Sequence, residues 1–204
     1  MQARPHFRKH LGADGGAQLV EFAVALPLLV VFVVGIFDFS GAFTLKQKLT
    51  NVTRDAARVA AADPASDVPS SSNTLPASVA DAYQLIVNYF AANGLNNCGM
   101  NATLETHSSG TAIWNFSSSG SGCPGTGLTI IINRGYYFPE NSSSVGPSVT
   151  CTPQAVGSQT AVIATCVSIQ YAYQWRFGNV DTLLGPSVAL PSTISVTAVA
   201  MNEN

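Results

Sequence analysis

Charged residues are scarce in this sequence. Lys, Arg, Asp and Glu together make up 10% of its 204 residues, against about 25% in an average soluble domain. Ser, Thr, Asn and Gly are abundant instead, and the sequence as a whole is not one continuous apolar stretch. This composition favours an exported, β-rich domain on a membrane anchor over a cytosolic enzyme.

Basic residues are nearly absent from the distal part of the chain. After Arg58 only Arg134 and Arg176 remain, against seven acidic residues, so residues 59–204 carry a net charge of −5. A nucleic-acid interface requires a basic patch or stripe. We therefore expect no nucleic-acid partner.

Residues that commonly perform catalysis or bind metals are also few. The chain has three histidines, of which only His107 lies beyond the first ten residues. It contains no GxSxG, HExxH or phosphate-binding glycine motif, and its cysteines do not form the CxxC pairs of a zinc site. We predict no catalytic residue, no metal and no cofactor, and hence a protein that acts by interaction.

The cysteines indicate where the distal part resides. All four follow the long apolar run, at Cys98, Cys123, Cys151 and Cys166. An even number in a short exported region predicts disulfides and a location outside the cytoplasm. Three pairings are possible, and the two local ones, Cys98 with Cys123 and Cys151 with Cys166, are favoured. Each would stabilise the fold by about 3 kcal/mol.

One long hydrophobic run dominates the N-terminal part. Residues 22–37 are 16 residues without a charge, a little short of the roughly 20 that a spanning helix needs. We expect the span to extend through Phe39 or Phe43. Three basic residues precede it, so the positive-inside rule predicts a cytoplasmic N-terminus and a distal part outside.

The helical pattern continues beyond this span. It runs from Ala17 to about Ala62, a length of about 69 Å, and the step from Asp63 to Pro64 is expected to end it. Its outer part is amphipathic, and the apolar stripe is expected to pack on the protein's own distal domain. The stripe consists of Leu45, Leu49, Val52, Ala56 and Val59.

The remaining sequence predicts a small α+β domain. A Pro/Ser-rich linker covers residues 63–77, a second helix residues 78–93, and a Ser/Gly-rich irregular region residues 94–126. Strands are predicted around 128–138, 161–177 and 193–201. In the middle strand one face carries Val167, Ile169, Tyr171 and Tyr173. The expected fold is a long N-terminal transmembrane helix that extends outside the membrane, followed by a small antiparallel sheet, one further helix and disulfides.

Glu21 and Asp38 flank the apolar run, and Pro27 lies inside it. A carboxylate inside a membrane span costs about 2.5–3.5 kcal/mol, so Glu21 either reaches the interface or needs a partner. If the chain were cut after Gly16, the new amine on Ala17 would lie one helical turn from Glu21. Pro27 removes a helix hydrogen bond and either kinks the span or is tolerated in it. Asp38 marks the outer membrane interface or contacts a partner.

Several short motifs in this helix resemble one known family. GAQLVEFA at 16–23, LPLL at 26–29, GIFDF at 35–39 and AARVA at 56–60 occur together and in order. This combination closely resembles the TadE-like family, which are pilin-like proteins of the tight adherence (Flp pilus) system. The resemblance covers about residues 16–62, whereas the distal part matches only loosely.

The resemblance implies a specific processing and assembly route. Residues 1–16 would be a prepilin-type leader, cut between Gly16 and Ala17 by a dedicated membrane peptidase. The helix of residues 17–62 would remain in the bacterial inner membrane or enter a pilus-related assembly with other pilin-like subunits and the assembly machinery. The resemblance implies assembly roles for Glu21, Phe22, Pro27 and Asp38. The large distal part, expected at residues 78–204, favours a minor pilin or assembly component over the bulk filament protein.

Two other functions remain open from the sequence. In the first, residues 1–42 are an ordinary signal peptide, cut near the bond between Gly41 and Ala42, and the product is a secreted binding protein. In the second, the helix is an uncleaved single-pass anchor for an envelope protein. The N-terminal residue of the mature protein distinguishes these possibilities from the pilin-like one.

Overall fold

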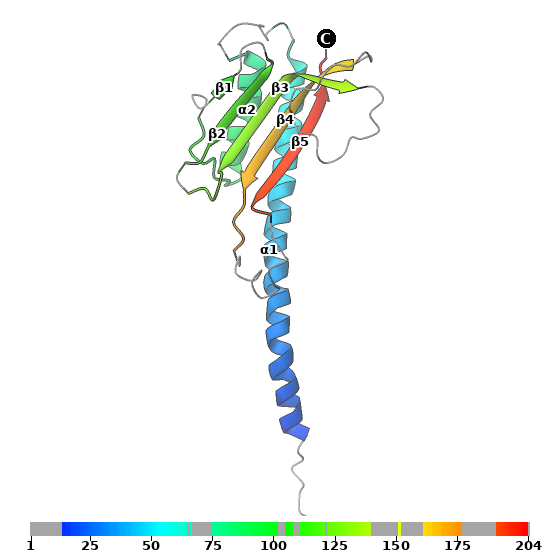
Figure 1. Cartoon of the computed structure of the whole chain (residues 1–204), viewed down its shortest axis with the longest axis vertical. Coiled ribbons are helices and arrows are strands. Elements are labelled where there is room, and N and C mark those ends of the chain that lie inside the picture. The colour runs from blue at the N-terminus through cyan, green and yellow to red at the C-terminus, as the bar shows by residue number, and fades with distance from the viewer. Residues whose placement is uncertain are drawn as a thin grey trace, which may run out of the picture.

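The computed structural model describes residues 14–64, 66, 75–101, 105–107, 111–120, 122–139, 151, 161–176 and 191–203. The described residues form two helices and five strands, which confirms the predicted α+β fold. In chain order these are α1 (Asp14–Ala62), α2 (Ala77–Ala92), β1 (Glu105–His107), β2 (Ile113–Ser118), β3 (Leu128–Pro139), β4 (Ala161–Ala172) and β5 (Thr193–Met201). Figure 1 shows the upper part of α1 behind the sheet and its lower part projecting alone from the domain.

Helix α1 is continuous over 49 residues and includes Pro27, which gives a rod of about 74 Å. It ends before the step from Asp63 to Pro64, as predicted, because a proline disfavours helical geometry in the residue before it. Most of the predicted leader, residues 1–13, and most of the predicted linker, residues 67–74, lie outside the described residues.

The sheet is an antiparallel meander with the strand order β1-β2-β3-β4-β5. Every strand therefore pairs with its neighbour in the chain, as is usual for consecutive elements. Residues alternate between the two faces of each strand. One face of the sheet carries large apolar side chains, among them Trp114, Phe116, Ile130, Ile132, Val167 and Ile169, all at most 2% exposed.

Both helices cover this apolar face. Helix α2 contributes Val79, Tyr83, Ile86 and Phe90 to the same cluster of buried residues as the sheet and α1. The ring of Tyr83 stacks on that of Phe116, with centroids 4.5 Å apart. The domain is thus a two-layer structure with a single main core between helices and sheet.

Helix α2 is terminated by a glycine. Gly94 has a φ of 63°, a left-handed conformation that a side chain would disfavour. It allows the Leu95 N–H to donate to the Phe90 carbonyl, 2.9 Å away, as in a Schellman motif. The chain then turns toward the first disulfide.

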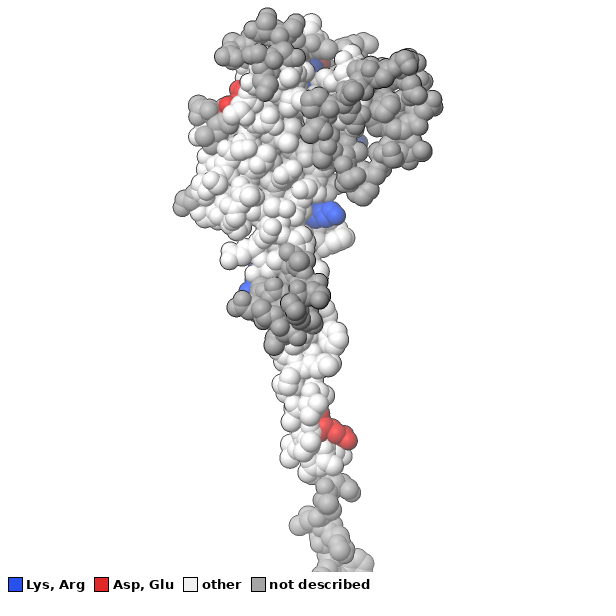
Figure 2. All heavy atoms as spheres, viewed as in Figure 1, with Lys and Arg blue, Asp and Glu red and all other residues white. Residues whose placement is uncertain are grey.

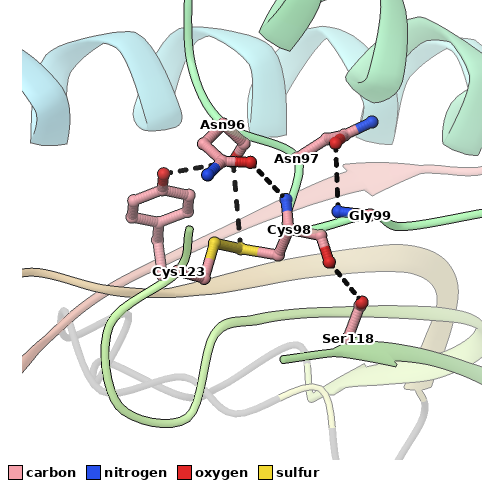
Figure 3. Close-up of a disulfide and its surroundings, with 7 residues drawn as sticks. Asn96, Asn97, Cys98, Gly99, Ser118 and Cys123 are labelled. Atoms are coloured by element: carbon pink, nitrogen blue, oxygen red, sulfur yellow. Dashed lines mark hydrogen bonds between the residues drawn. A yellow bond between two sulfur atoms is a disulfide. The ribbon is translucent and has the colours of Figure 1, made fainter. Parts of the chain in front are cut away.

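Two disulfides stabilise the domain. Cys98 pairs with Cys123 and Cys151 pairs with Cys166, with Cα atoms 5.4 and 5.5 Å apart. Figure 3 shows the first pair beneath the helices, where Ser118 Oγ donates to the Cys98 carbonyl at 2.6 Å. The second lies on the opposite face of the sheet in a smaller cluster with Tyr136 and Ala164.

Two sequence predictions for the sheet were wrong. The region 94–126 was predicted to be irregular, but it contains β1 and β2, whose core contribution rests on two aromatic residues rather than on a long apolar run. Strand β4 ends at Ala172 rather than near 177. There the Tyr173 N–H donates to the Ser192 carbonyl, and the next residues turn toward α1.

Candidate functional site

Residues 16–37 form the part of α1 that none of the other described elements covers, and we call it the bare part. None of these residues is buried, and every side chain from 16 to 30 is exposed. The helix contains an 18-residue window with a mean hydropathy of 2.7, long and apolar enough to cross a membrane. Figure 2 shows the lower rod almost entirely white, which marks uncharged residues. An apolar surface of this extent indicates a lipid or protein partner.

The predicted processing and assembly residues lie at the start of the bare part. Gly16, Glu21, Phe22 and Pro27 are all exposed. A Cβ atom on Gly16 would meet no atom within 4 Å, so the position next to the expected cut is sterically open. Ala17 and Glu21 are four residues apart in continuous helix, which places them on the same face.

Asp38 lies in a different environment, at the point where the domain first contacts α1. Its side chain is only 6% exposed. Its Oδ1 accepts a hydrogen bond from the Arg176 backbone N–H at 3.1 Å, and its carbonyl accepts one from the Tyr173 hydroxyl at 3.4 Å. Asp38 therefore contacts its own chain through the residues that follow β4.

We call the contact between residues 38–41 of α1 and residues 173–176 the junction. Phe39 and Gly41 also take part in it. The rings of Phe39 and Trp175 meet edge to face, with centroids 5.3 Å apart. A Cβ atom on Gly41 would come within 3.0 Å of the Tyr173 hydroxyl, so a larger residue there would require the tyrosine side chain to shift. Burial raises the pKa of Tyr173, the Asp38 carboxylate raises it further, and Arg176 lowers it.

Residues 49–61 form the buried part of α1. Leu49, Val52, Ala56 and Ala60 are fully buried in the main core, and Leu45 is partly buried against it. Four of the five residues of the predicted apolar stripe thus pack on the distal domain, whereas Val59 is half-buried and lines the groove between α1 and α2. The alanines have short side chains, which allow β5 and α2 to approach the helix axis closely.

The far end of α1 is held by Arg134 of β3. The β3–β4 pairing shifts between Asn133 and Tyr136, and such a bulge re-aims the side chain at its position. Arg134 is 2% exposed. It donates to the carbonyls of Ala60 and Asp63, the latter at 2.8 Å, and to Thr165 Oγ1 at 2.9 Å. A cation at a helix C-terminus also interacts favourably with the helix dipole.

A second basic residue serves helix α2 in the same way. Lys48 Nζ donates to the carbonyl of Asn93, the C-cap of α2, at 3.3 Å. Neither helix has a base in its own last turn. No local sequence pattern indicates these roles of Arg134 and Lys48, because the carbonyls of Ala60 and Asn93 that accept their hydrogen bonds lie 74 and 45 residues away along the chain.

An open groove separates α1 from α2. It has a volume of about 710 Å³ and carries two carboxylates, those of Asp55 and Asp81. Its other lining residues are Val59, Gln84, Leu85, Asn88, Tyr89 and Ala92. Since the lining has no basic residue, the groove is unsuited to an anionic ligand.

The only distal histidine has a packing contact. The His107 ring stacks on Trp114 at 4.9 Å, and its Nδ1 lies 3.0 Å from the Ile113 carbonyl. Burial raises the pKa of the neighbouring Glu105, while His107 lowers it. Within the described part of the chain, no group of three or more His, Cys, Asp or Glu side chains is arranged to hold a metal ion.

Comparison with known proteins bears on the helix rather than on the domain. Residues 16–58 match the family model described as TadE-like protein, which confirms the resemblance predicted from the sequence. No curated protein and no solved structure matches the chain. The matched segment contains the bare part, the α1 side of the junction and most of the buried part. The match and the apolar helix support a membrane-anchored, pilin-like protein related to the Tad pilus.

Proposed function

We propose that the chain is a minor pilin or pilus assembly component of a bacterial tight adherence system. In this proposal α1 spans the inner membrane with its N-terminus in the cytoplasm, and the sheet domain lies outside. The protein acts without catalysis, by packing its bare part against the helices of other pilin-like subunits. The TadE-like match over residues 16–58 is the observation that carries this proposal.

The proposed assembly surface is the bare part with Glu21. Its side chains are available to other helices because no element of the domain covers them. Within a bilayer a carboxylate is costly unless it is paired. Cleavage by a prepilin-type peptidase between Gly16 and Ala17 would create an amine on Ala17, and Glu21 would pair with that amine in its own or a neighbouring subunit.

The location of the disulfides supports the proposed orientation. Cys98–Cys123 and Cys151–Cys166 both lie in the domain beyond the helix, and disulfides persist in oxidising compartments such as the periplasm. Three basic residues precede the span, which favours a cytoplasmic N-terminus. The domain would then meet other pilus components outside the membrane.

The junction argues against an ordinary signal peptide. A cut near the bond between Gly41 and Ala42 would remove Asp38 and Phe39, which contact Arg176 and Trp175. It would also break a helix that is continuous into the domain core. A domain that uses residues 38–41 for its own contacts is expected to keep them.

The mature N-terminus tests processing. Mass spectrometry of the protein purified from membranes should find Ala17 as the first residue, and Gly16→Leu should abolish the cut. Gly35→Leu is the matched control, because neither glycine has an atom within 4 Å of its Cβ position. An intact Met1, or a start beyond Gly41, would overturn the proposal.

A second experiment tests assembly separately from processing. Glu21→Ala should insert and fold normally but lose cross-links to other pilin-like subunits in the membrane. Asp55→Ala is the control, since Asp55 is an exposed acid of α1 outside the bare part. Unchanged cross-linking and piliation in Glu21→Ala would contradict the assembly role.

A further inference from the structure

The junction lies one bilayer thickness from the start of the proposed mature helix. Residues 17–37 span about 32 Å at 1.5 Å per residue, and a typical hydrocarbon core is about 30 Å thick. None of these residues is buried by the domain, whereas Asp38 is. The domain thus begins to cover α1 where a helix spanning a bilayer from Ala17 would leave the hydrocarbon.

Aromatic side chains gather at this level. Trp175 meets Phe39 at 5.3 Å and Tyr173 at 5.1 Å, in both cases edge to face. The indole N–H of Trp175 also has a hydrogen-bond partner, because Nε1 donates to the Pro191 carbonyl at 2.9 Å. Trp and Tyr are enriched at membrane interfaces because their rings combine an apolar body with a polar edge.

At the junction the negative charge is buried and the positive charge is exposed. The Asp38 carboxylate is shielded, and it accepts the Arg176 backbone N–H. The Arg176 side chain is exposed, and a guanidinium binds phosphate oxygens in bidentate geometry. The next charged residue on α1 after Asp38 is Lys46, which is also exposed. Among the described residues at this level, an anionic surface would therefore meet positive charge and not the Asp38 carboxylate.

We propose that Phe39, Tyr173, Trp175 and Arg176, which we call the collar, lie in the phospholipid headgroup layer at the outer face of the membrane. The aromatic rings occupy the boundary with the acyl chains, and Arg176 contacts headgroup phosphates. Because the collar is fixed to α1 through Asp38, it sets the depth at which the helix stands in the bilayer. This inference rests on the proposed function only in requiring that α1 spans a membrane.

The chain offers a direct test, because Trp114 and Trp175 are its only tryptophans. Full-length protein is reconstituted into phosphatidylcholine vesicles whose acyl chains carry bromine, a contact quencher, either near the carbonyl end or near the methyl end. Trp175→Phe is measured alongside, and the difference isolates the Trp175 emission. Trp114 is 2% exposed in the domain core and is the internal control.

The expected result is a loss of Trp175 emission with bromine near the carbonyl end, a smaller loss with bromine near the methyl end, and no loss in Trp175→Phe. Unquenched Trp175 in vesicle-bound protein would overturn the proposal, and so would stronger quenching near the methyl end. Unquenched but blue-shifted emission would also overturn it, and would indicate that a second copy of the chain covers the collar.

Flotation of the same samples separates this inference from the proposed function. Protein that fails to float with the vesicles is not membrane-anchored, and the proposed function fails together with the collar. Protein that floats while Trp175 stays unquenched is anchored without a collar in the headgroup layer. Arg176→Gln should float normally and show weaker Trp175 quenching in vesicles containing phosphatidylglycerol, and unchanged quenching would remove the role of Arg176.

Discussion

Apart from Gln18 and Glu21, residues 16–37 of α1 are apolar on every side, whereas residues 49–61 bury one apolar stripe and expose charged residues elsewhere. Both stretches belong to the same unbroken helix. The difference lies in what surrounds them, because a helix that is apolar all round needs a non-aqueous environment and an amphipathic one needs a single packing partner. The periodicity of the sequence thus records where the surroundings of the helix change, close to Asp38.

The largest effect is expected at the far end of the buried part. Arg134→Met leaves the last carbonyls of α1 without their charged donor, and we expect a loss of about 4 kcal/mol in the free energy of unfolding. Urea unfolding in detergent micelles, followed by tryptophan fluorescence, measures this loss. The exposed Arg58→Met is the control and should stay within about 0.5 kcal/mol of wild type. Equal losses in the two variants would mean that Arg134 does not hold the helix end.

Removing the disulfides should destabilise the domain without destabilising the bare part of α1. Replacing Cys98 and Cys123 together by serine should destabilise the domain by about 3.5 kcal/mol, and replacing Cys151 and Cys166 by about 3 kcal/mol. The order follows from their sequence separations of 25 and 15 residues. Thermal unfolding followed by circular dichroism should show a helical signal from the bare part that persists in micelles. If that signal melted together with the domain, the two parts of α1 would not be independent.

A matched pair of leucines tests the comparison directly. Leu49→Ala removes a fully buried side chain and should cost the domain about 3 kcal/mol. Leu29→Ala changes a side chain that is 60% exposed, and the stability of the domain should not change. Both are measured by urea unfolding in the same detergent. A similar loss in both variants would show that the bare part also contributes to the domain core.

Asp38 tests where the bare part of α1 ends and the contact with the domain begins. Asp38→Ala removes the acceptor for the Arg176 N–H and should weaken the junction by about 1–2 kcal/mol. Asp38→Asn keeps an acceptor oxygen and should weaken it less. Limited proteolysis should cut residues 173–176 faster in the alanine variant than in the asparagine variant. Equal protection of wild type and Asp38→Ala would place the boundary elsewhere.

The smallest effect is expected at Lys48. Lys48→Met removes the donor to the Asn93 carbonyl and should cost about 0.5 kcal/mol, as for a partly exposed charge at a helix C-terminus. Lys46→Met is the control because Lys46 is exposed and makes no described contact with α2. Thermal unfolding in low salt resolves the difference. An equal shift in melting temperature in both variants would show that the loss of a positive charge, and not the loss of the Lys48–Asn93 hydrogen bond, causes the destabilisation.

The sequence predicted the elements whose patterns are long. Helix α1 was expected over 17–62 and runs from Asp14 to Ala62, and α2 was expected over 78–93 and runs from Ala77 to Ala92. Strands β3 and β5 also lie close to their predicted ranges. Each of these elements carries enough apolar residues to show its period, and the family match adds a second, independent signal for α1.

The features that sequence reasoning missed depend on pairing between distant segments. Strand β1 has three residues and no apolar alternation, and it forms only because β2 offers a neighbouring edge. Strand β4 was predicted too long because Tyr173 continues the alternation of Tyr171, although its hydroxyl contacts α1. The helix-end role of Arg134 requires the bulge in β3, which no local pattern indicates. The predicted roles of Gly16, Glu21, Phe22 and Pro27 stay predictions, because their partners are other molecules.

The contacts at both ends of the α1 segment that packs on the domain have a mechanical consequence. The domain holds α1 at Asp38 through residues 173–176 and at Ala60 and Asp63 through Arg134, and the apolar stripe lies between these points. A pull along the bare part therefore loads all of these contacts in shear, and the load is shared among them. Strand β5 ends beside the same helix, where the Glu203 N–H donates to the Ala61 carbonyl, and it shares this load. A tensile force applied to the membrane helix thus reaches the domain at several points along α1 rather than at the junction alone.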